Sequence, residues 1–499
     1  MQEEQPGLIP TRGVAAPTAN GYEVPEGKGE LVNRNSIIFT IGRSISLIGD
    51  GFYLQTLIIW ATSFTLAGAK TPTQQAAATV TVAAITAGIY GAYYLANLIV
   101  APFGGVFVDR LNRRTTMITA DLVQAVLATL PLGAFLVARS LFIPAIYLSF
   151  FLLTGFAGLF TSAQGGALQV IVSRRRLAQA VSILNILLGV GTVLGALFAP
   201  SFFLTVGPVV AILFNAASFI VSAISLFFLR IPDEAVNPYK YRQASEAASS
   251  SGIGPAIAGV FKDLGRGLRF TFTTRVLIAI AMLLIVAELG AGGTNAVTSS
   301  FFLVNLHANP TKDLALLGLL PAALGAGGIV GALLTGILAR YLPLKMLTTV
   351  SVLFLGLVLV GTAYQSSLIT GVIFFIVLGI FNSMFLVAYN ALVLKITPNT
   401  IVGRVQGALL PLNLVTGYIA TLVVGAFVKA NATVPNPAGL FQNIFLAGGV
   451  LIAIGSVVGM VLIWNTKEEL ARAEKLITPP AMVMPEGISG AQEVSGEDV

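Results

Sequence analysis

Four charged residues stand inside apolar stretches of this 499-residue sequence, and their side chains are the best placed to do chemistry. Arg43 and Asp50 fall in the first apolar stretch, Asp121 in the third and Glu288 in the seventh. A charge at the centre of a membrane helix costs at least about 2.5–3.5 kcal/mol on insertion scales, so it persists mainly where it faces water or a partner. A carboxyl group held there can exchange a proton or contact a cation.

The apolar stretches are long enough to be membrane-spanning helices. Hydrophobic residues make up 56% of the chain and charged residues 10%, whereas soluble domains carry about a quarter charged residues. A spanning helix needs about 20 mostly apolar residues. The sequence therefore predicts an all-α integral membrane protein with twelve transmembrane helices, at 37–66, 79–108, 114–138, 142–170, 178–205, 208–230, 275–304, 314–340, 344–364, 368–395, 402–429 and 438–464.

The twelve segments fall into two sets of six, at 37–230 and 275–464, whose similar length indicates a duplication. We expect each set to form a six-helix bundle. Residues 1–36 are expected to be a disordered cytoplasmic tail and 465–499 a second cytoplasmic tail. The linker, 231–274, carries apolar residues at helical spacing, which suits either a helix on the membrane surface or an ordinary charged linker helix.

The distribution of Lys and Arg predicts the orientation. Most of the 28 basic residues fall in the tails, in the linker and in alternate loops, which places both termini in the cytoplasm of a multi-pass protein of the plasma membrane. The net charge of +7 then reflects loop orientation, and we expect membrane lipids but no nucleic acid as partners.

Several chemistries lack the residues they need. The chain has no Cys, and its single histidine, His307, falls in a loop. We expect no metal site, no cofactor and no enzymatic activity. The sequence also contains no Gly-Lys-Ser/Thr nucleotide loop, so it gives no support for ATP-driven pumping.

The loop between the second and third segments carries a motif, G-x-x-x-D-R-x-x-R-R. Its defined positions are Gly105, Asp109, Arg110, Arg113 and Arg114. The glycine allows close backbone approach, and the aspartate can face the positive N-terminal end of another helix. A simple positive-inside loop would explain the last two arginines, but not the glycine and the acid at these spacings.

With this motif at this position, the chain resembles the major facilitator superfamily over about residues 37–464. The resemblance implies two bundles around a central cavity that opens alternately to either side, a small-molecule substrate, and action as a monomer. It also implies that Asp109 meets the start of span eleven, at Thr400 to Arg404, and closes the cytoplasmic side. The equivalent segment of the second half has Arg340 in place of the acid, so we expect no second latch there.

Shorter pieces resemble the efflux branch that includes bacterial macrolide and enterobactin exporters. They are the stretch from Ser46 to Gly51, Ala120-Asp121, and the stretch from Gly265 to Phe270. This resemblance favours export of amphipathic small molecules, such as drugs or metabolites. Two features of drug antiporters are missing or incomplete: span four contains no Arg, and the span-five signature retains only Gly195 and Pro200. Arg43 is a candidate replacement for the missing cation.

The resemblance implies that Asp50 and Glu288, at comparable depth in equivalent helices, line the cavity. We hypothesise that one or both couple proton movement to transport. The alternatives are a structural hydrogen-bond acceptor at Asp50 and a direct contact with cationic cargo at Glu288. Because Arg43 and Asp50 lie about 10 Å apart along the helix axis, we do not expect them to pair directly. Asp121 is expected to join the motif arginines in a structural network, with a role in coupling as the alternative.

Two other functions stay open on sequence grounds. The same fold can take up a nutrient instead of exporting cargo, because fold does not fix function. A non-transporting membrane receptor or sensor is the alternative from another class. Polar residues elsewhere in the spans are expected to hold helices together rather than to contact cargo. They are Asn97, Gln124, Gln164, Asn185, Asn215, Asn295, Asn382 and Asn390.

Overall fold

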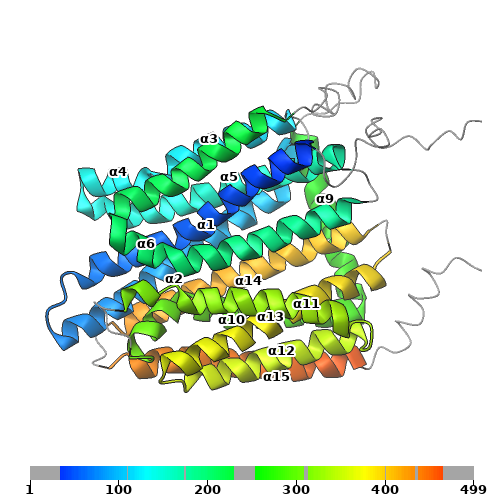
Figure 1. Ribbon diagram of the computed structural model, residues 1–499. Coiled ribbons are helices and arrows are strands. Elements are labelled where there is room, and N and C mark those ends of the chain that lie inside the picture. The colour runs from blue at the N-terminus through cyan, green and yellow to red at the C-terminus, as the bar shows by residue number, and fades with distance from the viewer. Residues whose placement is uncertain are drawn as a thin grey trace, which may run out of the picture.

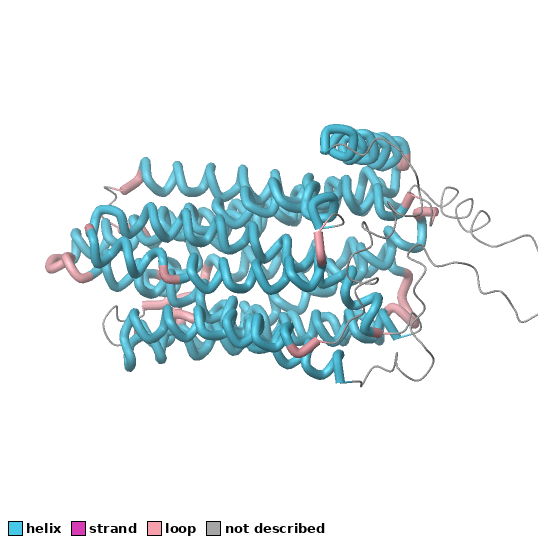
Figure 2. Tube along the Cα trace, turned by 90° about the horizontal axis from the view of Figure 1, so that it is seen from above, coloured by secondary structure: helices cyan, strands magenta, loops and turns pink. Residues whose placement is uncertain are grey.

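The computed structural model describes residues 34–108, 111–172, 176–229, 253–307, 313–398, 401–432 and 436–464. Regular structure in these ranges is entirely helical, and most of the helices lie side by side along one direction (Figure 1). Seen from above, short loops connect the ends of neighbouring helices (Figure 2). The all-α prediction is confirmed. Most of both predicted tails lies outside the described residues.

The first half of the chain forms six helices and one short 3-10 turn. They are α1 (Arg34–Leu66), α2 (Pro72–Val108), α3 (Arg113–Ala128), α4 (Leu130–Val137), η1 (Arg139–Leu141), α5 (Phe142–Ile171) and α6 (Leu177–Phe227). The third span, predicted as one helix, is divided into α3 and α4. Pro131 lies in the first turn of α4, where the missing N–H of proline is tolerated, and the helix restarts there.

The longest helix, α6, contains two membrane spans. A straight helix of its 51 residues would be about 77 Å long, more than twice the hydrocarbon thickness. Gly207 interrupts it with φ 83° and ψ 170°, a conformation that glycine adopts without strain, and Pro208 follows directly. Eleven helices of the described ranges are long and apolar enough to span a membrane. Counting α6 as two gives the twelve predicted spans.

The second half begins with a helix in the linker, α9, and continues with six long helices. They are α9 (Ile253–Thr273), α10 (Arg275–Val304), α11 (Leu319–Leu338) preceded by the turn η3 (Leu314–Leu316), α12 (Leu344–Ala363), α13 (Leu368–Ile396), α14 (Val402–Ala430) and α15 (Ala438–Trp464). The linker helix runs across the direction of the others, near the end where α1 begins (Figure 1). We call this end of the molecule the α9 end and the opposite one the far end.

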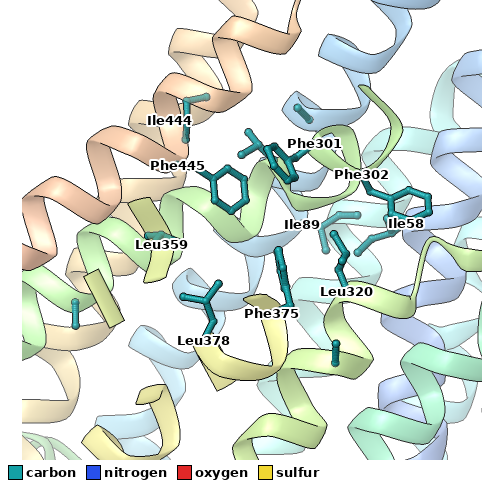
Figure 3. Packing of buried hydrophobic residues seen from close by; sticks show 14 of the residues in the cluster. Ile58, Ile89, Phe301, Phe302, Leu320, Leu359, Phe375, Leu378, Ile444 and Phe445 are labelled. Atoms are coloured by element: carbon teal, nitrogen blue, oxygen red, sulfur yellow. The ribbon is translucent and has the colours of Figure 1, made fainter. Parts of the chain in front are cut away.

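The two halves pack tightly at the far end. They meet where α2 touches α10 and α14, and where α6 touches α11. One buried apolar cluster contains Ile58 and Ile89 of the first half together with Phe302 and Leu320 of the second (Figure 3). The buried Ser300 Oγ donates a hydrogen bond of 2.8 Å to the carbonyl oxygen of residue 79 on α2. The far end is therefore closed.

Toward the α9 end, glycines on the same helix faces make no close contact, as two pairs show. Gly425 and Gly407 of α14 are 18 residues, or about five turns, apart and so share a face. A Cβ at Gly425 would lie 3.1 Å from Ala87 of α2, whereas one at Gly407 would meet nothing within 4 Å. Gly318 and Gly336, also 18 residues apart, behave alike: the first lies against α6 and the second faces open space. At these two positions near the α9 end, α14 and α11 therefore make no close contact with the opposite half.

Glycines also set the packing within the second half. A Cβ at Gly327 of α11 would lie 2.0 Å from the carbonyl oxygen of Ile376 of α13, and one at Gly379 would lie 2.0 Å from that of Leu324. Only hydrogen at these positions allows the backbones of α11 and α13 to approach so closely. This contact explains why glycine occupies these two positions.

Candidate functional site

Glu288 lies near the middle of α10 and bonds to both halves of the molecule. The hydroxyl of Tyr94, on α2 of the first half, donates a short hydrogen bond to Glu288 Oε1. Asn413 Nδ2, on α14, donates to Glu288 Oε2 over 3.1 Å. Both carboxylate oxygens are therefore hydrogen-bonded, and the acid joins three helices, one of them from the opposite half.

Aromatic side chains surround this acid. Tyr93 and Tyr389 lie within electrostatic reach of Glu288, and Tyr93 is 41% exposed. The rings of Tyr93 and Tyr94 meet edge to face with centroids 5.4 Å apart. A half-buried carboxylate among aromatic rings can hold a proton or an organic cation, because ring faces attract positive charge. The two alternatives predicted for Glu288, proton exchange and contact with a cationic cargo, both fit this geometry.

A close helix contact holds Tyr94 in position. A Cβ at Gly417 of α14 would lie 2.3 Å from the Tyr94 ring, so the ring rests directly on the glycine backbone. Sequence reasoning missed Tyr94, Tyr389 and Asn413. Uncharged side chains on different spans give no sign in a sequence that they converge on one acid.

Arg43 and Asp50 form an ion pair, contrary to our prediction. Arg43 Nη1 lies 3.9 Å from Asp50 Oδ2. Seven residues are nearly two helical turns, so the two side chains share a face, and the long arginine chain covers the distance between their Cα atoms. The Asp50 side chain is 34% exposed, while that of Arg43 is 9% exposed.

Arg43 is held by more than its acid partner. Its Nη1 donates to Ser46 Oγ over 3.2 Å, and its guanidinium lies 4.5 Å above the centre of the Phe160 ring. Phe160 belongs to α5, which is the fourth span. The cation of α1 therefore rests against the span that lacks an arginine of its own.

Asp121 is fully buried and does not join the motif arginines, so this prediction was wrong for Arg113 and Arg114. Its carboxylate makes no hydrogen bond of good geometry in the described part of the chain, and the charges that act on it are Arg43 and Asp50. Asp121 lies about 12 Å along α3 from Arg113. The structure thus gathers Arg43, Asp50 and Asp121 within the first half.

The motif arginines bind helix backbones instead. Arg113 Nη1 donates to the carbonyl oxygen of Gly166 on α5 over 3.0 Å. Arg114 Nε donates to that of Leu226 over 2.9 Å, at the C-terminal end of α6, where carbonyls lack helical partners. Asp109 and Arg110 lie outside the described residues, as does the side-chain environment of Gly105. The latch prediction for Asp109 therefore stays a prediction.

The start of α14, where the latch was expected, carries a different ion pair. Arg404 Nε lies 3.0 Å from Asp263 Oδ1 of α9. Among the other polar residues in the spans, Gln124 bonds across to the carbonyl of Leu153 on α5, as expected for a residue that holds helices together. Asn97 and Asn390 bond only within their own helices.

Comparisons with known proteins identify a family and a fold for this chain. A sequence profile described as the Major Facilitator Superfamily matches residues 51–413, more than half of the chain. No curated protein matches the sequence. Among solved structures, a variant of the nucleoside transporter NupG is 15% identical, with a TM-score of 0.63, and the match covers 85% of this chain and 99% of that one.

Two further structures show the same fold at low identity. A bacterial homologue of the iron transporter ferroportin, in an inward-facing state, is 14% identical with a TM-score of 0.59, over 86% of this chain and 98% of that one. A bacterial homologue of the human lysosomal transporter Spinster, inward-facing and unoccupied, is 13% identical with a TM-score of 0.57, over 89% and 98%.

Proposed function

Because this chain belongs to the Major Facilitator Superfamily, we propose that it is a secondary active transporter that exports amphipathic small molecules by alternating access. The family and the fold support a multi-pass membrane transporter. Export, the class of cargo and proton coupling are our proposals, based on the short efflux-like stretches and on the environment of Glu288.

The α9 end is the cytoplasmic end in this proposal, with both termini on that side of the plasma membrane. The loops there carry the arginines of the 105–114 motif, Arg340, Lys345 and Arg404, whereas the described far-end loops carry few basic residues. Basic residues favour the cytoplasmic side during insertion. In this proposal the free space at Gly407 and Gly336 near the α9 end belongs to an opening toward the cytoplasm, and the packed far end closes the outer side.

The observation that carries the proposal is the hydrogen bond from Tyr94 to Glu288, which joins the two halves. An ionised carboxylate is a stronger acceptor than a neutral acid. A proton or a cationic cargo group at Glu288 therefore competes for the charge that holds Tyr94. Such a ligand favours the arrangement in which the two halves no longer share this bond. Asp50, beside Arg43, is the second candidate for proton binding.

The direction of transport is tested with a lipophilic cationic dye. Cells that express the protein should accumulate less dye than cells without it, and the difference should vanish when the proton gradient is collapsed. Higher accumulation would instead support uptake, the alternative for which the fold of a nucleoside transporter gives a precedent. Dye binding without any transport in reconstituted vesicles would support a receptor.

The coupling residues are tested in proteoliposomes with an imposed pH gradient. Glu288→Gln and Asp50→Asn each remove a proton-binding group while keeping the side-chain size, and Asp313→Asn makes the same change outside the spans. We expect one or both of the intramembrane variants to lose gradient-driven transport and the control to retain it. Unchanged coupling in both intramembrane variants would rule out proton coupling through them. Loss of dye affinity alone in Glu288→Gln would identify a direct cation contact.

A further inference from the structure

A pocket of about 340 Å³ lies between α9 and the start of α14, away from Glu288. Its volume falls at the lower end of the range for small-molecule sites, roughly 300–1,000 Å³. The lining combines arginines with apolar side chains. The lining includes Arg266, Arg269 and Phe270 of α9 and Ile401, Arg404 and Val405 around the start of α14.

The rim of the pocket is positively charged. Arg404 and Arg266 both face one acid, Asp263, at 3.0 and 3.5 Å. The third arginine, Arg269, is exposed and has no acidic partner in the described part of the chain. Three guanidinium groups thus stand against one carboxylate, and the rim keeps an excess of two positive charges. Guanidinium groups bind phosphate through paired hydrogen bonds.

The rest of the pocket is apolar. Phe270 and Ile401 are half-buried, and Val405 is fully buried. The two helices are held close together here, because a Cβ at Gly267 would lie only 2.0 Å from the carbonyl oxygen of Arg404. A site with a cationic rim and an apolar lining suits a ligand that is itself anionic at one end and apolar at the other.

The position of α9 places this pocket at the edge of the membrane. The helix is strongly amphipathic, runs across the direction of the spans, and leads directly into α10 (Figure 1). Phe261 and Phe272 on α9 are more than half exposed, as expected for apolar side chains that face lipid. Lipid headgroups are therefore the most concentrated source of phosphate at this site.

We propose that the pocket between α9 and α14 binds the phosphate headgroup of an anionic phospholipid. The arginines bind the phosphate, and the apolar lining contacts the carbon atoms of the lipid that are nearest to the phosphate. A bound lipid bridges α9 and the start of α14, two elements that already share the pair between Asp263 and Arg404. The site is independent of the transport cargo and of Glu288.

The test uses delipidated full-length protein in a neutral detergent, titrated with phosphatidylglycerol, with phosphatidylcholine or with inorganic phosphate. Binding is read by native mass spectrometry and by the melting temperature. We expect phosphatidylglycerol to bind and to raise the melting temperature, and phosphatidylcholine to bind much more weakly. Saturation by inorganic phosphate, with displacement of the lipid, would overturn the lipid assignment in favour of a free-phosphate site.

Variants on α9 locate the binding. Arg269→Gln leaves the pair between Asp263 and Arg404 intact and should weaken phosphatidylglycerol binding about fivefold, as expected for one basic residue at an anionic lipid surface. Lys262→Gln removes an equal charge from the same helix, outside the pocket lining. It should have a much smaller effect. Equal loss in both variants would indicate general charge attraction and overturn the proposal, as would unchanged binding in Arg269→Gln.

Discussion

At the scale of single residues, different partners compensate each intramembrane charge for the free-energy cost of leaving water. Glu288 accepts hydrogen bonds at both oxygens, one of them from the opposite half. Arg43 pairs with Asp50 and lies against an aromatic ring. Asp121 has the Ser222 hydroxyl and the charge of Arg43 nearby to compensate its burial. The sequence identified all four as exceptional, but their partners lie on other helices, except for the pair between Arg43 and Asp50.

Tyr94→Phe removes the hydroxyl that joins the two halves and keeps the ring that rests on Gly417. We expect the variant to fold and insert as the parent does, because a hydrogen bond inside a membrane contributes only about 0.6 kcal/mol to stability on average. Its pH dependence of transport should shift, since Glu288 loses a partner of its ionised form. Transport measured across a pH series checks this. Tyr93→Phe serves as the control, because the Tyr93 hydroxyl does not donate to Glu288 in the described structure. Identical pH dependence of transport in the two variants would contradict the expectation.

Arg43→Gln removes the cation that faces both Asp50 and Asp121. Breaking a buried charge pair typically costs about 3–5 kcal/mol, because the remaining charge is left unpaired. We therefore expect a lower melting temperature in Arg43→Gln than in Asp50→Asn, in which Asp121 still faces the arginine. The melting temperature of the detergent-purified variants is the measurement. A more stable Arg43→Gln than Asp50→Asn would show that the two acids do not depend on this cation.

At the scale of elements, glycines decide which helices come close. The contact of α11 with α13 places Gly327 and Gly379 directly against backbone carbonyls, while the contact of α6 with α11 joins the two halves at Gly318. The sequence is rich in glycine, with 52 residues. It did not distinguish a glycine in a tight contact from one that faces open space, because both kinds occur along the same helix.

Gly327→Leu and Gly336→Leu make the same change on one helix, α11. A side chain at Gly327 must displace the backbone of α13, whereas Gly336 has open space within 4 Å. We expect the first variant to lose most of its folded yield and the second to retain it. Yield of monodisperse protein on gel filtration measures the effect. Equal yields would mean that the close approach of α11 and α13 is not needed for folding.

At the scale of the whole molecule, the two halves pack together at the far end, whereas Gly407 and Gly336 near the α9 end face open space. Family members alternate between openings to either side, and two of the solved structures with this fold are inward-facing. We propose that this chain alternates between such states as well. The hydrogen bond from Tyr94 to Glu288 joins the two halves in the state described here.

The cysteine-free chain allows this one-sided opening to be mapped by labelling. Gly407→Cys and Gly425→Cys place a thiol on the same face of α14, about five turns apart. A water-soluble maleimide should modify the first, which faces open space, and not the second, which faces Ala87 of α2. Mass spectrometry of the intact protein measures the modification. Failure to label position 407 would show that its open space holds lipid rather than water.

The sequence predicted the helical class, the count of twelve spans and most of their limits, because hydrophobicity along the chain reports insertion into lipid directly. The errors were local. Span three has its predicted limits but contains a break in the helix before Pro131. Helix α2 begins at Pro72, seven residues earlier than predicted, because polar Thr73, Gln74 and Gln75 lower the hydropathy without preventing a helix. The ion pair of Arg43 with Asp50 was missed because axial distance alone neglects the length of the arginine side chain.

What the sequence by itself determined is therefore the set of helices and the identity of the charged residues within them, since both depend on properties that are local along the chain. Only the tertiary structure decided which residues meet. The partners of Glu288 come from positions 94 and 413, and those of Arg404 from a linker helix. Such contacts depend on the relative rotation and height of packed helices, and hydrophobic periodicity does not encode these quantities.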